Sequence, residues 1–178
     1  LLNPTLNFQG GNINSLPFKY DAQFNNEINN ISLLSIKLSK KDWNSRETSW
    51  DFERSPLLNE STSLKEAYLK WQDSITQDFF QLHENEEELN RIFIDIYGLQ
   101  EELTPEVTLK DITILQEELD RNALEQLEPV FRTKGANAVT LPIKKEEVIS
   151  QFLSYSIGVF MGRYRLDKPG LHIAHPNP

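Results

Sequence analysis

Four residues near the end of the chain carry side chains that are suited to contact phosphate groups. Arg163, Tyr164, Arg165 and Lys168 lie within six residues of one another. Arginine, lysine and tyrosine commonly donate hydrogen bonds to DNA phosphates, which makes these four residues the DNA-contact candidates. A structural interpretation competes with this one, because cations at the end of a helix complement its dipole and Asp167 can pair with either arginine.

A second group of ionisable residues invites a catalytic or metal-binding interpretation. Glu84, Glu86, Glu87 and Glu88 follow His83 directly or closely. Consecutive positions on a helix point around its circumference, so these carboxylates diverge and cannot share one metal ion. The pattern therefore favours a solvated helix face, and we expect a surface or packing role for His83.

The composition excludes several kinds of active site. The 178 residues contain no cysteine and three histidines, which removes thiolate zinc sites and cysteine nucleophiles and leaves little material for a histidine-based triad. Gly10 and Gly11 lack the strand-to-helix context of a dinucleotide site. We therefore predict no catalytic residue, no cofactor-binding residue and no metal ligand in this chain.

Charge is distributed unevenly along the sequence. The chain has a net charge of −9, whereas residues 60–128 hold 18 acidic and five basic side chains, a net charge of −13 that leaves +4 for the two ends together. A phosphate backbone would repel the acidic middle, so nucleic-acid contacts are expected from the flanks. No apolar run approaches the ~18 to 20 residues of a membrane span, and no signal-peptide pattern is present. We expect a cytoplasmic protein with no membrane contact.

Hydrophobic periodicity predicts a first helix over residues 22–38 and a much longer one from Ser63 to Tyr97. Ser63 and Glu66 have the spacing of a capping box, and Gly98 ends the pattern. At ~1.5 Å per residue the long helix would extend about 50 Å, so part of it should project or pair with another helix. Its apolar stripe comprises Leu64, Tyr68, Trp71, Ile75, Phe79, Leu82, Leu89, Phe93 and Ile96, interrupted by Glu86.

The second half of the chain alternates predicted helices and loops. Residues 115–127 are predicted to be helical, residues 128–142 to form a loop because they contain two prolines and a glycine, and residues 144–164 to form the last helix. In that helix Gly158 and Gly162 predict a close approach, which we expect from the long helix. The residues expected to be buried are Val148, Phe152, Leu153, Tyr155, Val159 and Phe160.

These elements predict a mostly α-helical protein, in which a long central helix packs with two or three further helices and short extended segments lie near the N-terminus. The organisation comprises an extended segment over residues 1–20, a helix and linker over residues 21–58, a helical region over residues 59–165 and an irregular tail over residues 166–178. Buried aromatic side chains are expected to fix the path of the linker. The linker aromatics are Trp43, Trp50 and Phe52.

Five strings of sequence together carry a family resemblance. They are residues 3–17, residues 48–58, residues 85–99, residues 102–107 and residues 154–170. In this order they resemble the C-terminal part of large adenine-specific DNA methyltransferases, namely the Type II restriction-modification fusions and the methyltransferase of BREX phage-defence systems. The resemblance covers nearly the whole chain except residues 117–149.

The resemblance implies a function for a longer parent protein. In that family the S-adenosylmethionine site and the Asn-Pro-Pro-aromatic catalytic loop lie upstream, and Asn3-Pro4-Thr5 lacks the second proline and the adjacent aromatic residue of that loop. The parent is therefore expected to methylate adenine in DNA with S-adenosylmethionine. This chain would be a noncatalytic helical region that follows the methyltransferase and target-recognition parts and supports DNA recognition or subunit docking.

Two other functions remain open from the sequence. The acidic long helix could belong to an interaction module that binds a protein of the defence system and makes no DNA contact. A hydrolase that uses paired carboxylates is disfavoured, because no apolar setting that would raise a carboxylate pKa is visible.

Overall fold

The computed structural model describes residues 17–172, and this part of the chain is mostly helical. Its helices are α2 (Asn25–Trp43), α3 (Leu64–Tyr97), α4 (Arg121–Lys134) and α5 (Lys145–Phe160), with 3-10 turns η1 (Leu109–Asp111) and η2 (Ala136–Ala138). Between residues 17 and 172 there is no named strand, and β pairing is limited to isolated bridges. The predicted fold class is confirmed, whereas the extended segment predicted for residues 1–20 falls largely outside the described residues.

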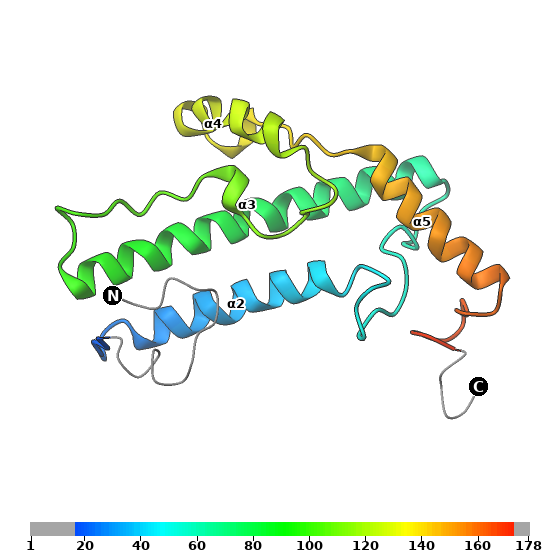
Figure 1. The fold of residues 1–178 in the computed structure, drawn as a ribbon, viewed down its shortest axis with the longest axis horizontal. Coiled ribbons are helices and arrows are strands. Elements are labelled where there is room, and N and C mark those ends of the chain that lie inside the picture. The colour runs from blue at the N-terminus through cyan, green and yellow to red at the C-terminus, as the bar shows by residue number, and fades with distance from the viewer. Residues whose placement is uncertain (1–16, 173–178) are drawn as a thin grey trace, which may run out of the picture.

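Helices α2 and α3 run side by side in opposite directions and form the long body of the molecule (Figure 1). Polar contacts follow the pair along its length: Asn85 Nδ2 donates to Ser35 Oγ at 3.2 Å, and Lys41 Nζ to Asp78 Oδ2 at 2.5 Å. At the far end, Tyr97 Oη donates to the carbonyl of residue 17 at 2.8 Å. The chain that leads into α2 is thus held against the C-terminal end of α3.

The predicted ends of the long helix are confirmed. Ser63 Oγ accepts a hydrogen bond from the Glu66 amide at 3.2 Å, which satisfies one of the free N–H groups at the helix start. Gly98 ends the helix with a φ of 72°, a left-handed conformation that glycine adopts without the steric penalty of a side chain. The 34 residues of α3 extend about 51 Å at ~1.5 Å per residue.

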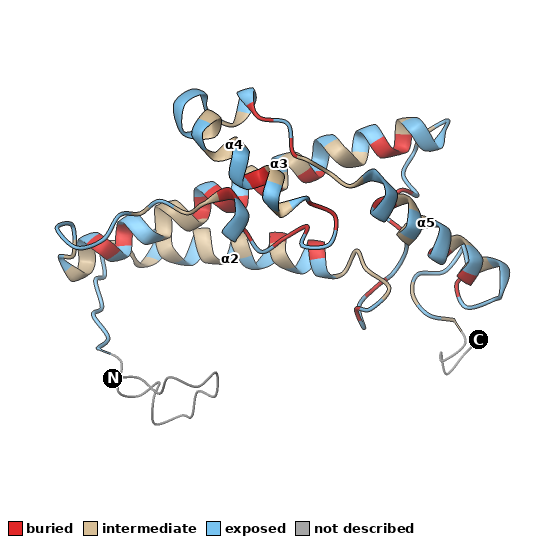
Figure 2. Cartoon of the chain, turned by 45° about the horizontal axis from the view of Figure 1, so that its top comes forward, coloured by how far each residue is buried: buried red, intermediate tan, exposed pale blue. Residues whose placement is uncertain are grey.

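The main hydrophobic core lies against the middle of α3, where the segment from η1 to α4 crosses it (Figure 2). Phe79 and Leu82 of α3 are 0% and 1% exposed, whereas Phe93 is 41% exposed, so the apolar stripe is not buried along its whole length. A smaller cluster of Leu57, Tyr68 and Val148 joins the first turns of α3 to α5. The main core contains Leu38, Ile75, Phe79, Leu82, Leu109, Ile112, Ile114, Leu115, Leu119, Leu124 and Leu141.

The linker after α2 differs from the prediction. Helix α2 continues to Trp43, five residues beyond the predicted end at Leu38, because Leu38 packs in the main core and Asp42 is also buried. Trp43 and Trp50 are 58% and 102% exposed, so the expectation that buried indoles fix the linker is wrong. Phe52 is the linker aromatic that is buried.

Helix α4 lies six or seven residues later than predicted. Asp120 Oδ1 accepts hydrogen bonds from the amides of residues 122 and 123, which makes Asp120 the cap that starts the helix. The helix then passes through Pro129 and ends at Lys134, before Gly135, so the predicted loop over residues 128–142 is wrong in its first part. Pro129 deprives the carbonyl of Glu125 of its helical donor, and both residues are exposed, so water can replace that donor.

Helix α5 ends at Phe160, four residues earlier than predicted. Phe160 is 90% exposed and Leu153 is 54% exposed, so the predicted burial of these two residues is wrong. The close approach predicted at Gly158 is present but comes from Tyr164, because a Cβ atom at residue 158 would lie 2.7 Å from Tyr164 Cδ2. Gly162 instead lies beyond the helix, with a φ of 75°.

We predict that Phe79→Ala lowers the free energy of unfolding by about 3 to 5 kcal/mol, because the ring is fully buried and its loss leaves a cavity. The denaturant midpoint measures this effect. Phe93→Ala is the matched control on the same helix and should change the midpoint much less. Equal midpoint shifts for the two variants would contradict the assignment of the core.

Candidate nucleic-acid interface

A fixed turn follows α5 and carries the four DNA-contact candidates. The amide of Arg163 donates to the carbonyl of Gly158 at 2.7 Å, which turns the chain back against the last turn of the helix. The carbonyl of Arg163 then accepts from the amide of His172 at 2.7 Å, and the amide of Gly170 donates to the carbonyl of Glu53 at 2.8 Å. Residues 163–172 are therefore tied both to α5 and to the linker.

Tyr164 fastens this turn from the inside. Its ring stacks on Tyr155 with the ring centroids 5.1 Å apart and meets Phe52 edge to face at 5.5 Å. Burial, followed by the neighbouring Glu47 carboxylate, raises the pKa of Tyr164 to about 12. Tyr164 is 5% exposed, so it holds the turn in place and does not offer its ring at the surface.

The three cationic candidates lie at the surface of the turn. Arg165 donates to both carboxylate oxygens of Asp167, at 2.8 and 2.6 Å, and this bonding holds the pKa of the Asp167 carboxyl below its usual range. Arg163 Nη1 lies 3.8 Å from Glu47 Oε1, and Lys168 is exposed. The pairing of Arg165 with Asp167 that the structural interpretation predicted is confirmed. DNA contact by these residues stays a prediction.

The acidic group on α3 is less solvated than predicted. His83 is 3% exposed, with Nε2 2.8 Å from the carbonyl of Val107 and its ring edge-on to Phe131, which confirms a packing role. Glu87 accepts from the amide of Val107 at 3.0 Å and from Arg132 Nη1 at 2.6 Å. Burial would raise the pKa of Glu87, but these hydrogen bonds lower it below its usual value.

The solvated-face interpretation is therefore wrong for Glu87, which fastens the segment from residue 105 to η1 onto α3. Sequence spacing could not predict this contact, because Val107 and Arg132 lie 20 and 45 residues away along the chain. Over the described range from residue 17 to residue 172, no three or more histidine, aspartate or glutamate side chains are grouped so that they could hold a metal ion.

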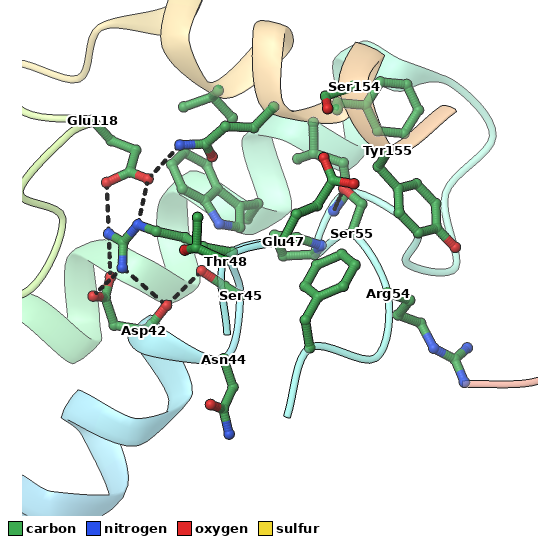
Figure 3. Close-up of a pocket in the computed structure, with 18 of the residues that line it drawn as sticks. Asp42, Asn44, Ser45, Glu47, Thr48, Arg54, Ser55, Glu118, Ser154 and Tyr155 are labelled. Atoms are coloured by element: carbon green, nitrogen blue, oxygen red, sulfur yellow. Dashed lines mark hydrogen bonds and ion pairs between the residues drawn. The ribbon is translucent and has the colours of Figure 1, made fainter. Parts of the chain in front are cut away.

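A cavity of about 730 Å³ lies between the linker, α5 and the first half of α3. It is next to the turn of residues 163–172, which is called the basic turn from here on. Figure 3 shows Asp42 and Glu118 on one side of this cavity and Tyr155 and Arg54 on the other. Tyr155 Oη and one carboxylate oxygen of Glu47 are buried without a hydrogen-bond partner. The cavity thus combines aromatic walls with a few polar groups of both charges.

A buried ion network forms one wall of the cavity. Arg46 Nη1 donates to Asp42 Oδ2 at 2.7 Å, and Arg46 Nη2 donates to Glu118 Oε2 at 2.9 Å. Gln151 of α5 donates to Glu118 Oε1 at 2.8 Å, and the amide of Leu115 donates to Asp42 Oδ1 at 3.0 Å. The network therefore joins three parts of the chain: the end of α2, helix α5, and the segment that precedes α4.

The network shifts the pKa values of Arg46 and Glu118 in opposite directions. Burial alone would lower the pKa of Arg46, but the hydrogen bonds that it donates to Asp42 and Glu118 raise it. Burial alone would raise the pKa of Glu118, but hydrogen bonds from Arg46 and Gln151 lower it. Sequence reasoning missed this site: the spacing of Asp42 and Arg46 is that of a helical ion pair, but nothing in the sequence pointed to Glu118.

Two curated proteins are similar to this chain along almost its whole length. The adenine-specific methyltransferase PglX of Lacticaseibacillus casei (strain Zhang) is 36% identical over 180 residues, which cover 98% of this chain and 13% of that protein. The adenine-specific methyltransferase BrxX of Escherichia coli O9:H4 (strain HS) is 30% identical over 175 residues, with the same two coverages. The chain is homologous to one segment of adenine-specific methyltransferases.

This homology confirms the resemblance predicted from the sequence and extends it through residues 117–149, because the alignments cover 98% of the chain. The chain spans 13% of the length of each of these relatives. No protein-family profile matches the chain. None of the helices found between residues 17 and 172 has the length and apolar character required to cross a membrane.

We predict that acid weakens the fold of this chain through Glu118. Its folded-state pKa is lowered, so the ionised network contributes stability above the unfolded-state pKa of about 4.3, and this stability is lost as pH falls through the folded-state pKa. At pH 7, Glu118→Gln should lower the free energy of unfolding by about 3 to 5 kcal/mol, because it leaves Arg46 with one charged partner in a buried site.

Chemical denaturation at pH 7 and at pH 3.5 measures both effects. The variant should lose less stability between the two pH values than the wild type does. The control is Glu125→Gln, which removes an exposed carboxylate that pairs with Lys110 at the surface. A Glu118→Gln variant with the same pH dependence as the wild type would show that another carboxyl group causes the acid response.

Proposed function

We propose that this chain is a noncatalytic helical region of an adenine-specific DNA methyltransferase from a restriction-modification or phage-defence system, and that it supports DNA recognition through the basic turn. The relatives that cover almost the whole chain are named as adenine-specific methyltransferases. The parent would transfer a methyl group from S-adenosylmethionine to adenine N6, with the base turned out of the duplex. This region would bind the DNA backbone beside that reaction.

The observation that carries the DNA role is the way the basic turn is built. Tyr164 is buried and locks the turn, while Arg163, Arg165 and Lys168 stay exposed on it. Cations on a fixed support lose little conformational freedom on binding, so they can set the register of a protein on a duplex. The acidic stretch from residue 60 to residue 128, at −13, would be repelled by the same phosphates.

The arrangement of the molecule adds a spatial argument. The residues that lead into α2 contact the C-terminal end of α3, whereas the basic turn follows α5 at the opposite end of the α2–α3 pair (Figure 1). The long helices would therefore act as a spacer that places the basic turn far from the point where the chain enters this region.

An interaction module without DNA contact is the second candidate. This candidate is favoured because both arginines of the turn already have a carboxylate neighbour. Arg165 pairs with Asp167, and Arg163 faces Glu47. An arginine with a carboxylate partner must exchange that partner for a phosphate, which weakens the contact. The salt dependence of DNA binding separates the two candidates.

We predict that Arg163→Ala together with Arg165→Ala weakens binding of the full-length methyltransferase to all duplexes and leaves its sequence preference unchanged. Each lost phosphate contact should make the slope of log affinity against log salt shallower by roughly one unit. Fluorescence anisotropy with duplexes at several salt concentrations measures affinity and slope.

The matched control is Lys37→Ala together with Lys65→Ala, which removes the same charge from exposed positions on α2 and α3. The control should leave the slope near the wild-type value. If the arginine variant keeps both wild-type affinity and wild-type slope, the turn makes no phosphate contact and the interaction module is the better account.

We also predict that the chain by itself binds no S-adenosylmethionine, because the cofactor loop and the adenine-gripping loop of the family lie upstream of it. Isothermal calorimetry should give no stoichiometric heat with the isolated chain and a clear one with the full-length methyltransferase. A stoichiometric heat with the isolated chain would contradict the assignment of this region as noncatalytic.

A further inference from the structure

Helix α5 carries large apolar side chains on two faces, and one of these faces is exposed. Val148, Phe152 and Tyr155 pack inward against α3 and the basic turn. The opposite face presents a stripe with the helical spacing of four and three residues, which continues into the cap residue after the helix. This outer stripe consists of Leu153, Ile157, Phe160 and Met161, which are 54%, 57%, 90% and 71% exposed.

The surroundings of the outer stripe also lack charge. From Val148 to Gly162 the sequence contains no charged residue, and the polar residues of this stretch are serines and one glutamine. A solvated helix face normally carries charged side chains, whereas the centre of a protein interface is depleted of them and enriched in aromatic residues and methionine. The largest contiguous apolar patches on a soluble protein are often functional, as sites that another surface covers.

We propose that the outer stripe of α5 packs, within the same polypeptide, against a part of the methyltransferase that lies outside these 178 residues. This proposal rests on the proposed function only in taking the chain to be part of such a methyltransferase. The partner surface should be an apolar groove or helix face.

The size of the stripe favours a partner within the same polypeptide over a second copy. Its four side chains are far fewer than the about 20 to 30 residues that each partner contributes to a stable complex between separate chains. A covalent connection raises the effective concentration of the two surfaces and allows a small interface to stay closed. The matched segment covers 13% of each relative, so most of the length of such proteins is available to supply the partner surface.

DNA is a less suitable occupant of the stripe. Protein surfaces that bind DNA are more polar and more positively charged than those that bind protein, and the stripe has no cation before Arg163. An exposed Phe160 next to Arg163 could act as an apolar wedge between base steps, but Ile157 and Leu153 lie one and two turns back along the helix and would remain uncovered.

Photo-crosslinking in the full-length methyltransferase tests the proposal. The photoreactive amino acid p-benzoylphenylalanine replaces Ile157 in one protein and the exposed Leu69 of α3 in the control. Without DNA, the probe at residue 157 should crosslink within the same chain to a peptide outside this segment, and the control should not. Crosslinks between two chains, crosslinks that form only to added duplex, or the absence of any crosslinked product would each overturn the proposal.

A second pair of variants provides an independent readout. Ile157→Ser together with Phe160→Ser should lower the thermal midpoint of the full-length protein by several degrees, because water replaces the contact that the stripe makes. Leu69→Ser together with Leu103→Ser should leave the midpoint unchanged, since these exposed leucines lie elsewhere on the surface. The salt slope of DNA binding should stay at its wild-type value in both, so loss of docking and loss of the DNA role are distinguishable. An unchanged midpoint for the stripe variant would contradict the docking proposal.

Discussion

The ion network of Asp42, Arg46 and Glu118 is the contact on which the arrangement of the helices depends. The side chains of the three residues are no more than 10% exposed, and they connect segments that lie 72 residues apart in the sequence. Buried charges are tolerated only when each one is matched and hydrogen-bonded, so this network admits little variation in geometry. Through Gln151 it also fixes α5, and through Leu115 it fixes the segment that crosses the core. Because the basic turn follows α5, its position depends on the ion network, which lies on the other side of the cavity.

The molecule separates its charges along its length. The long helical pair and the segment from η1 to α4 contain most of the acidic residues, and many of them are used internally, as Glu87 and Glu118 show. The basic turn, with its exposed cations, is held in place by a buried cluster of three aromatic rings. An acidic body with a rigid basic end would orient the protein as it approaches a polyanion, because the body is repelled while the end is attracted.

The sequence predicted those features that depend on local periodicity and capping. The ends of α3 at Ser63 and Gly98 follow from a serine cap and a left-handed glycine, both of which act within a few residues. The position of α4 was mispredicted because proline was taken to end a helix, whereas Pro129 lies on an exposed face where the free carbonyl can bind water.

The linker was mispredicted because its anchor is Arg46 and not a tryptophan, and the partner of Arg46 comes from a distant segment. Of the four candidate residues, Tyr164 faces inward because Gly158 leaves room for its ring, which no spacing rule reveals.

The full exposure of Trp50 has a spectroscopic consequence. This indole is already hydrated in the native state, so its fluorescence emission should change little when the chain unfolds. Trp50 lines the same shallow groove as Pro169 and Gly170, which places it beside the end of the basic turn. A nucleobase or a protein surface that arrives there would shield or quench the indole. Trp50 is therefore an intrinsic optical reporter of what approaches this end of the molecule, while the half-buried Trp71 in the interior would report on the fold itself.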